Sequence, residues 1–366
     1  MVSFSIMMGH AKSKDLVYWE HLPLALKPSH DKGESHCFSG CCLLNKGTPM
    51  IIYTSIGPDR TPTKGAEQWL AIGDSNMINW KKYVKNPVMA QSLINEFEII
   101  DWRDPFIWKE DEYWYLILGG HLENPIRPLI SLYRSQNLYD WEFIKTLRIE
   151  DRKKGKNWEC PNFFKMNENY ILIVSPHDRV IYSIGSYNNF EFKSNEWNIL
   201  DYGKLYYATN GIIDKNNRLI LWAWIKARGS TNWNGCLTLP RILSTSDDLK
   251  LNYKFPTELR KLRLQSYYVK DITINNKYTC NEFNYENFCI EIKIELEKLD
   301  AELFYIKLTA SDTFNKNQVI GYDIKNKLFW AGKDKIHNFI LSNNEPLKMH
   351  IYIDVSILEV IINEKE

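Results

Sequence analysis

A short stretch, Ser13-Lys-Asp-Leu-Val-Tyr-Trp19, indicates the fold because similar stretches recur along the chain. Clear copies are Ser75-Asn-Met-Ile-Asn-Trp80 and Ser135-Gln-Asn-Leu-Tyr-Asp-Trp141, and looser copies are Ser186-Tyr-Asn-Asn-Phe-Glu-Phe192 and Ser246-Asp-Asp-Leu-Lys-Leu251. The copies recur about every 50–60 residues, close to the repeat length of propeller blades. We expect each copy to form a polar turn between the outer strands of one blade, with its last residue re-entering the core.

Strand-like runs of β-branched and aromatic residues lie between the copies, flanked by turn residues. These runs are Pro49–Ser55, Tyr113–Leu118, Tyr170–Ser175 and Leu219–Trp224. Helical periodicity is nearly absent, so five copies predict an all-β chain that begins with a five-bladed β-propeller over residues 1–255. Because little sequence precedes Ser13, we expect the first blade to be incomplete. The alternative is a chance similarity of turns in an aromatic-rich β protein.

The sequence pattern changes after Arg260. Phe288–Leu296, Lys348–Asp354 and Ile357–Ile362 alternate or cluster apolar residues in short runs. Alternation with a period of two predicts half-buried antiparallel strands, so we expect residues 260–366 to form a C-terminal β-sandwich. The last run almost reaches the C-terminus, and we expect this sandwich to lack a closing strand.

Composition excludes several classes of protein. The 366 residues are 44% hydrophobic and 25% charged, as in ordinary globular proteins. The formal net charge of +1 provides no strong field for nucleic acid or an acidic membrane, so we expect neither as a partner. No apolar run approaches the length of a bilayer span. Aromatic residues reach 14%, which favours a β-rich fold and surfaces that stack on sugars.

The cysteines and the N-terminus give weaker indications. Seven cysteines are spread thinly without metal-ligand spacing, so neither a disulfide framework nor a zinc site is predicted. The segment Met1–His10 has no basic start and only a short apolar stretch, so we predict no signal peptide and a cytoplasmic location. The oligomeric state cannot be read from the sequence.

Two motifs combine carboxylates with aromatic residues: Asp101-Trp-Arg-Asp-Pro105 and Trp158-Glu-Cys-Pro161. Inner propeller strands bring distant residues to one channel, so Asp104 and Glu159 are expected to face a common ligand. Glycoside hydrolysis uses such a pair, with one carboxylic acid protonating the leaving oxygen. Trp158 would exclude water from Glu159 and favour its protonated form. The alternative is that Arg103 and Asp104 form a structural ion pair and that Glu159 is a solvated edge carboxylate.

The ordered set of motifs resembles glycoside hydrolase family 32, the β-fructofuranosidases. The resemblance covers almost the whole chain and its motifs are, in order, Gly9–Pro28, Cys37–Gly40, Trp102–Pro105, Trp158–Pro161, Asp201–Gly203, Tyr207–Ala208, Leu221–Ile225, Trp233–Gly235, Leu239–Arg241, Ile353–Asp354 and Leu358–Val360. It implies a five-bladed propeller followed by a β-sandwich, in agreement with the repeat. It also implies hydrolysis of terminal fructosyl units of sucrose or fructans, without a metal or organic cofactor.

The resemblance assigns roles to individual residues. Glu159 matches the general acid/base, and Asp104 matches the transition-state stabiliser that grips fructose hydroxyls. Arg103 is expected to help hold the sugar, and Phe38 and Ser39 match an element near the fructosyl unit. We place Trp158 with these substrate-binding residues because it adjoins Glu159. A core Phe and a turn Ser are equally consistent with the sequence at positions 38 and 39.

One element of the family pattern does not occur in the sequence. Family members carry the nucleophilic Asp in a Trp-x-Asn-Asp-Pro-Asn-Gly element, and Asp15 belongs to the repeat turn instead. We therefore expect a chain that is shortened at its N-terminus and at its C-terminus, with negligible hydrolysis of sucrose. The alternatives are a catalytically inactive carbohydrate-binding relative and a gene fragment that folds poorly.

Overall fold

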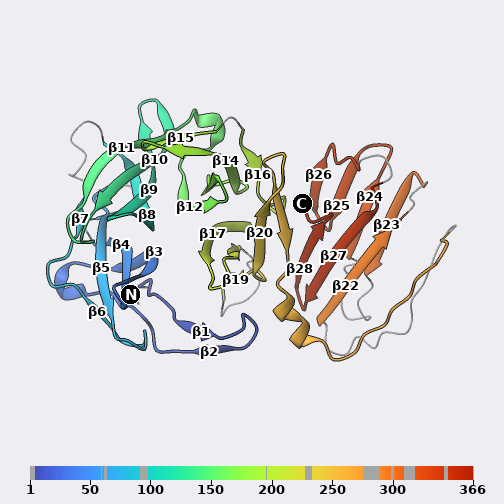
Figure 1. The fold of residues 1–366 in the computed structure, drawn as a ribbon, viewed down its shortest axis with the longest axis horizontal. Coiled ribbons are helices and arrows are strands. Elements are labelled where there is room, and N and C mark those ends of the chain that lie inside the picture. Colours follow the sequence, from blue (N-terminus) through green and yellow to red (C-terminus); the bar gives the residue numbers. More distant parts are fainter. Residues whose placement is uncertain are drawn as a thin grey trace. The chain divides into compact units, whose positions relative to one another are not determined.

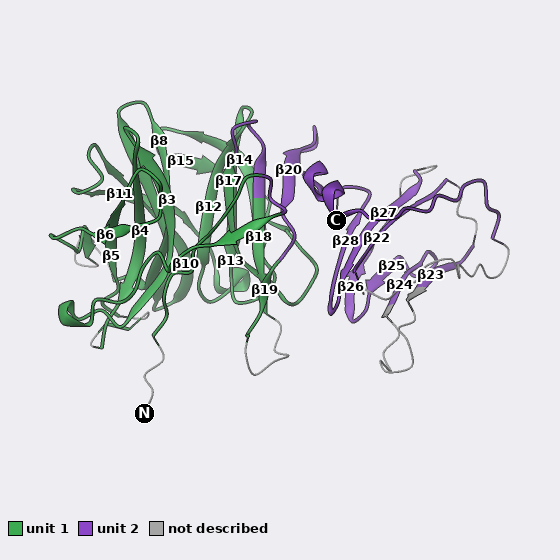
Figure 2. Ribbon diagram, turned by 90° about the horizontal axis from the view of Figure 1, so that it is seen from below, with its two compact units in different colours: residues 1–14, 18–213, 221–237 green, residues 15–17, 214–220, 238–366 purple. Residues whose placement is uncertain are grey.

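The computed structural model describes residues 5–58, 60–61, 64–90, 98–194, 196–226, 233–274, 289–297, 301–308, 318–341 and 345–365. Two compact units make up the chain (Figure 2). Unit 1 comprises residues 1–14, 18–213 and 221–237, and unit 2 comprises residues 15–17, 214–220 and 238–366. Each unit is described separately below.

Unit 1 consists of antiparallel sheets whose strands follow one another in sequence order (Figure 1). One sheet holds β3 (His36–Asn45), β4 (Thr48–Ile56), β5 (Glu67–Gly73) and β6 (Trp80–Lys82), with β7 (Met89–Ala90) on β5. The next holds β8 (Ile100–Glu110), β9 (Tyr113–Glu123), β10 (Ile126–Ser135) and β11 (Glu142–Ile149). A third holds β12 (Glu159–Met166), β13 (Asn169–Ser175), β14 (Ile181–Asn188) and β15 (Glu191–Lys193), with β16 (Asn198–Ile199) on β14.

The remaining strands of this part are β17 (Tyr206–Ile213), β18 (Leu219–Ile225) and β19 (Cys236–Leu237), and the hairpin of β1 (Ala11–Ser13) with β2 (Trp19–His21). The first strands of successive sheets are neighbours: β8 contacts β3 and β12, and β12 contacts β17. Figure 1 shows these strands at the inner ends of their sheets. Unit 1 is therefore an all-β propeller, as predicted. The count of five blades stays a prediction.

The described helices are short 3-10 turns: η1 (His30–Lys32), η3 (Arg152–Lys154) and η4 (Thr257–Leu262). Within the described ranges, no helix has the length and apolar character that crossing a bilayer requires. The core comes from the strands instead, with Trp102 fully buried and its indole donating to the hydroxyl of Tyr133 at 2.9 Å.

Every copy of the repeat forms the turn between two paired antiparallel strands, as the sequence predicted. In the third copy, the Ser135 hydroxyl accepts the Leu138 N–H at 2.9 Å, and Leu138 has a left-handed φ of 71°. The Trp141 indole then donates to the Leu138 carbonyl at 3.1 Å. Side-chain hydrogen bonds to nearby backbone groups are the usual way in which Ser and Asp fix turns.

In the second copy, the turn begins one residue earlier than the sequence comparison indicates. Its left-handed residue is Met77, and the Trp80 indole donates to the Met77 carbonyl at 3.2 Å. The position equivalent to Ser135 is therefore Asp74 and not Ser75. Asp74 takes over the role of serine, because its carboxylate accepts the Ile78 N–H at 2.9 Å. The turn needs an acceptor at this position, and either side chain supplies one.

Unit 2 contains two sheets and a hairpin. The first sheet pairs β22 (Cys289–Leu296), β27 (Leu347–Asp354) and β28 (Ile357–Ile362). The second pairs β23 (Leu303–Leu308), β24 (Gln318–Asp323), β25 (Leu328–Ala331) and β26 (Asp334–His337). The hairpin is β20 (Arg241–Thr245) with β21 (Leu251–Lys254). This architecture confirms the predicted β-sandwich; the predicted strand residue Phe288 lies outside the described residues, and β24, β25 and β26 were not anticipated.

A buried ion pair crosses unit 2. The Arg241 guanidinium donates to Glu359 Oε2 at 3.0 Å, and the side chains are 8% and 5% exposed. Glu359 Oε1 also accepts the backbone N–H of Leu239 at 2.7 Å. Removing one partner of such a pair leaves the other charge buried without compensation, which is far more costly than losing a surface pair.

Glu359→Gln should therefore lower the free energy of unfolding by about 3 kcal/mol, because the buried Arg241 guanidinium then loses the carboxylate charge of Glu359. The control is Glu295→Gln, which removes the exposed partner of Lys348 at 2.8 Å and should change stability little. Urea unfolding followed by circular dichroism measures both. Equal effects of the two substitutions would contradict the importance of the buried pair.

Candidate active site

The inner strands of unit 1 are irregular at the residues that the sequence singled out. The pairing of β3 with β4 shifts between Cys37 and Gly40, which brackets Phe38 and Ser39. The pairing of β8 with β9 shifts on both sides of Arg103, and that of β12 with β13 shifts immediately after Glu159. Bulges of this kind re-aim side chains out of the regular alternation of a strand. The predicted site residues are thus placed by local interruptions of the sheets.

Left-handed backbone conformations occur at the same places. Asp101, Asp104, Cys160 and Ala208 have φ values of 56°, 62°, 46° and 50°. Such conformations are unfavourable for residues with a side chain and persist only where the surroundings hold them. Four of them lie on β8, β12 and β17, beside the residues that the sequence singled out, so we take this part of the inner strands as the candidate site.

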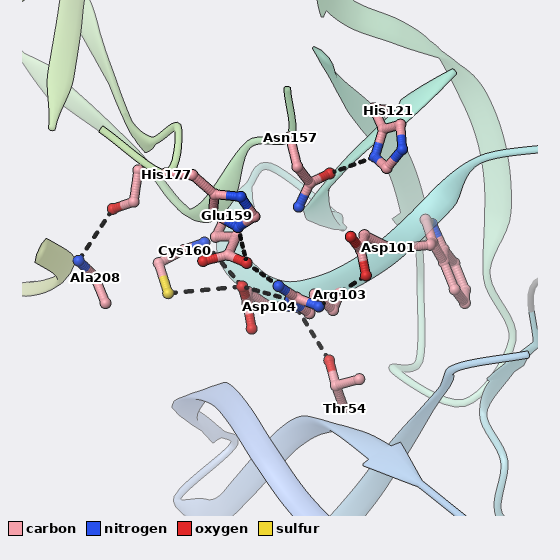
Figure 3. Close-up of polar contacts among 12 residues, drawn as sticks. Thr54, Asp101, Arg103, Asp104, His121, Asn157, Glu159, Cys160, His177 and Ala208 are labelled. Carbon is pink, nitrogen blue, oxygen red and sulfur yellow. Dashed lines mark hydrogen bonds and ion pairs between the residues drawn. The ribbon is translucent and has the colours of Figure 1, made fainter. Parts of the chain in front are cut away.

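Asp104 is fixed from both sides. Its backbone N–H donates to the Thr54 hydroxyl on β4 at 3.0 Å, and that hydroxyl donates to Gln68 at 2.8 Å. Its Oδ2 accepts the backbone N–H of Cys160 at 2.9 Å, while the Cys160 sulfur lies 3.6 Å from the same oxygen (Figure 3). The carboxylate is only 6% exposed. Residues on two other sheets therefore hold Asp104, one through its backbone N–H and one through its carboxylate.

The Cys160 thiol stays protonated in this environment. Burial raises its pKa well above the ordinary value, and the neighbouring charge of Asp104 raises it further. Ser39 lies close enough to lower the thiol pKa slightly, which places Ser39 beside the Asp104–Cys160 contact. The thiol is therefore a hydrogen-bond partner of Asp104 and not a nucleophile.

Arg103 joins the carboxylates of the site (Figure 3). Its guanidinium donates to Asp101 Oδ1 at 2.9 Å and makes a close ion pair with Glu159 Oε1. Its Nε lies 3.7 Å from Asp104 Oδ2. A planar guanidinium with several donors can serve three acids at once, which an ammonium group could not do in one geometry. Asp104 and Glu159 thus lie together around one cation. That they face a common ligand stays a prediction.

Glu159 accepts hydrogen bonds on both oxygens. Tyr207 donates its hydroxyl proton to Oε2 at 2.7 Å, and His177 Nε2 lies 2.6 Å from Oε1. The His177 backbone N–H donates to the Tyr207 oxygen at 3.1 Å, which closes the group of three residues. The Glu159 side chain is 13% exposed, so it reaches solvent only along one side.

The titration behaviour of these neighbours follows from their surroundings. Burial raises the pKa of Tyr207 far above its ordinary value, so the hydroxyl keeps the proton that it donates. Burial lowers the pKa of His177 below 6.5, and the positive charges of Arg103, Lys156 and Lys226 lower it further against the opposing effect of Asp101. At neutral pH, His177 therefore meets Glu159 as a neutral imidazole.

The other predicted residues differ in exposure. Phe38 is half-buried and Ser39 is exposed on the bulged part of β3. Trp158 is fully buried, donates its indole N–H to the Lys154 carbonyl at 2.9 Å and packs against Trp197. Its ring offers no surface to a sugar, which corrects the expectation of direct contact. It lies in the core next to Glu159, where it helps to exclude water.

Three residues of the site were not assigned a role from the sequence. Thr54 lies inside a regular strand run, His177 lies in a turn after β13, and Tyr207 was noted only as part of a motif. None of them stands in a carboxylate motif, so no local pattern reveals them. Tertiary contacts alone bring them to Asp104 and Glu159.

Metal ligation has no support in the described part of the chain, where no group of three His, Cys, Asp or Glu side chains is arranged to hold an ion. The side chains at the site are carboxylates, hydroxyls and cationic groups.

Comparison with known families identifies the family of the chain. The model of the glycosyl hydrolases family 32 N-terminal domain matches residues 3–256, and that of the glycosyl hydrolases family 32 C terminal matches residues 258–366. The chain belongs to glycosyl hydrolase family 32. It is a β-fructofuranosidase-like member of this family, which confirms the resemblance inferred from the motifs.

Similar proteins are found among curated and solved members of the family. A sucrose-6-phosphate hydrolase of Zymomonas mobilis is 28% identical over 98% of this chain and 76% of its own length. A cell wall β-fructofuranosidase of Pisum sativum is 29% identical over 71% of this chain and 53% of its own length. The Bombyx mori family 32 β-fructofuranosidase BmSUC1 superposes with a TM-score of 0.81 at 26% identity, covering 98% of this chain and 78% of that one.

Thr54→Val should weaken the contacts that hold Asp104 in place. The substitution removes the acceptor of the Asp104 N–H and the donor to Gln68, and leaving buried polar groups unpaired costs about 1–3 kcal/mol of unfolding free energy. Thr54→Ser keeps the hydroxyl and serves as the control. Thermal and urea unfolding, with fructose binding by calorimetry, should show larger losses for valine than for serine. Equal losses would mean that the methyl group matters and the hydroxyl does not.

Proposed function

We propose that this chain binds the terminal fructosyl unit of sucrose or a fructan, and that Glu159 is the general acid/base and Asp104 the transition-state stabiliser of a retaining two-carboxylate mechanism. The observation that carries the proposal is the convergence of Arg103, Asp104 and Glu159 in one group at the inner ends of β8 and β12. These residues come from two motifs far apart in the sequence.

Asp104 and Arg103 are suited to hold sugar hydroxyls. An ionised carboxylate accepts hydrogen bonds from hydroxyl groups, and such bonds strengthen as positive charge develops on the sugar ring. Asp104 is fixed by Thr54 and Cys160, so it needs little reorganisation during the reaction. Arg103 can donate to the sugar oxygens that Asp104 leaves free. Phe38 and Ser39, on the neighbouring bulge of β3, are proposed to line the fructosyl side.

Glu159 has the surroundings of a residue that gives and regains a proton. Tyr207 and His177 fix the orientation of its two oxygens, and its open side leads to solvent. Protonation of the leaving oxygen by a positioned acid contributes about 10²–10⁴-fold to a rate. In the complex, the Arg103 guanidinium is proposed to turn from Glu159 to the sugar, which frees Oε1 to carry the proton.

Whether a nucleophilic carboxylate acts beside Glu159 decides between two candidate functions, a hydrolase and a sugar-binding relative. The sequence contains no Trp-x-Asn-Asp-Pro-Asn-Gly element, which favours a sugar-binding relative without turnover. The intact Arg103–Asp104–Glu159 group favours a hydrolase. Relatives support a sugar ligand in either case: curated relatives are named sucrose-6-phosphate hydrolases, and a mutant of the Bombyx mori enzyme has been solved in complex with sucrose.

Fructose and sucrose should raise the melting temperature of the 366-residue protein, because a ligand that binds only the native state stabilises it. Asp104→Asn should abolish most of this shift while changing the ligand-free melting temperature little. Maltose, which has no fructosyl unit, is the control ligand. Absence of any shift with fructose and sucrose would overturn the proposed function.

An external nucleophile tests the acid role of Glu159 separately. With sucrose and azide, Glu159 gives its proton to the glycosidic oxygen, the bond from that oxygen to fructosyl C2 breaks, and azide forms a bond to C2. The products are glucose and fructosyl azide. We expect negligible glucose release without azide, azide-dependent release in the wild type, and a loss of about 10²-fold or more in Glu159→Gln. Azide-dependent release that survives this substitution would refute the acid assignment.

A further inference from the structure

One face of the second sheet of unit 2 carries aromatic side chains that the proposed function does not use. The strands β23, β24, β25 and β26 pair in sequence order without a register shift, unlike the inner strands of unit 1 (Figure 1). Residues that pair directly across antiparallel strands point to the same side of a sheet. One row of pairs therefore places Tyr305, Gly321, Trp330 and Lys335 together on one face.

This face is open to solvent, whereas the opposite face belongs to the core. The next row of pairs on the opposite face includes Tyr322, Phe329 and Ile336, which are all buried. On the open face, Tyr305 is 57% exposed and Trp330 is half-buried. An aromatic side chain that stays in water on a regular sheet gives up the burial that would stabilise it, and such surfaces often bind a partner.

A glycine makes this surface flat. A Cβ at Gly321 would lie 2.5 Å from Cη2 and 2.7 Å from Cε2 of the Trp330 indole, so the ring lies directly over this residue. Trp330 therefore lies along the sheet instead of standing up from it, with one face of the ring on Gly321. Tyr305 pairs with the same glycine from the other side, at a strand spacing of about 4.8 Å. The two rings thus lie over adjacent strands.

Apolar and polar side chains border the two rings. Leu303 is 50% exposed and Leu328 is half-buried, and both pair with Asp323 on the same face. The Asp323 carboxylate is fixed by the backbone N–H and the side-chain amide of Asn326, each at 2.8 Å. A carboxylate can accept further hydrogen bonds beyond these two. The face therefore combines flat rings with an oriented acceptor.

Charge and shape together indicate the kind of ligand. On the strands of this face, the described charged side chains are Asp323 and Lys335, which cancel one another. The face thus lacks the excess of positive charge that nucleic acid or an anionic membrane requires. A sugar ring presents an apolar C–H face that fits a flat aromatic ring, and hydroxyl groups at its edge that fit polar side chains. A neutral glycan matches both properties.

We propose that Tyr305 and Trp330 form a platform on unit 2 that binds the chain of a polymeric β-fructan. The inference rests on the proposed function, because it takes the class of the polymer from the ligand of unit 1. Each ring stacks on one sugar unit, and Asp323 accepts hydroxyl protons. A polymer can occupy two sites of one protein at once, so binding at the platform keeps the polymer on the protein while unit 1 takes a chain end.

Native electrophoresis in gels that contain inulin measures this binding without turnover. Asp104→Asn is the background, because it is expected to weaken the fructosyl site of unit 1. Inulin should retard this variant, and adding Tyr305→Ala should weaken the retardation at least about fivefold, since one stacking ring is lost. Tyr268→Ala is the matched control, since Tyr268 is an 84% exposed tyrosine of the same unit outside this sheet. Absence of retardation, or an equal loss in the control, would overturn the proposal.

A substitution of Trp330 tests the second ring. Trp330→Leu keeps an apolar side chain beside Gly321 but removes the flat ring, so inulin binding should fall while the melting temperature changes little. Inulin binding that survives both Tyr305→Ala and Trp330→Leu would refute the assignment. Sedimentation velocity tests another occupant: if Tyr305→Ala converts a dimer into a monomer, this face contacts a second copy of the chain and the glycan platform is wrong.

Two comparisons separate the platform from the function on which it rests. Amylose is a neutral glucan, and equal retardation by amylose and inulin would overturn the assignment to fructans. If fructose raises the melting temperature but inulin fails to retard Asp104→Asn, the platform is wrong and the fructosyl site stands. If fructose and sucrose give no shift while inulin binds through Tyr305, the proposed function of unit 1 is wrong and the platform is real.

Discussion

The hydrogen bond from the Cys160 amide to the Asp104 carboxylate is the constraint on which the site depends. It connects two inner strands through residues 56 positions apart in sequence, each in a left-handed conformation that its own strand disfavours. Neither irregularity would persist alone. Each bulge presents the group that holds the other, and the Thr54 hydroxyl adds a third strand to the same network. The motifs at Asp104 and Glu159 are therefore one structural unit.

Arg103 balances the charges that this arrangement gathers. Asp101, Asp104 and Glu159 would repel one another at such separations in a partly dry site. One guanidinium contacts all three, which makes the ligand-free site electrostatically tolerable. The same contact would have to yield when a sugar arrives. Arg103 is thus both a stabiliser of the free site and a donor available to a ligand.

The repeat turns, several strands and the two acids of the site could be predicted from the sequence, because each depends on residues close together in the chain. The repeat turn uses a fixed spacing of an acceptor, a left-handed residue and an indole, so the copies at Ser135 and Trp141 are visible in the sequence itself. Apolar runs such as Tyr170–Ser175 match β13 because burial on both faces leaves little choice of residue. The acids Asp104 and Glu159 stand out because carboxylates are rare in such runs.

Other features depend on contacts between distant segments and leave no local pattern. Thr54 is one polar residue in a strand, and its importance comes from the Asp104 amide on another sheet. His177 lies in a turn, where polar residues are expected in any case. Trp158 is expected from the sequence to contact sugar because it adjoins Glu159, but it lies just before β12, where its ring packs against Trp197 in the core.

The repeat turns that end in Trp80 and Trp141 bear on how a protein with such repeats could arise by duplication. Trp80 and Trp141 donate to carbonyls three residues earlier, so this hydrogen bond lies within each turn and involves no other sheet. A duplicated copy of the sequence could therefore form the same turn at a new place in the chain. Multiplication of one such module needs this kind of local autonomy, and later divergence could then change residues elsewhere in each copy.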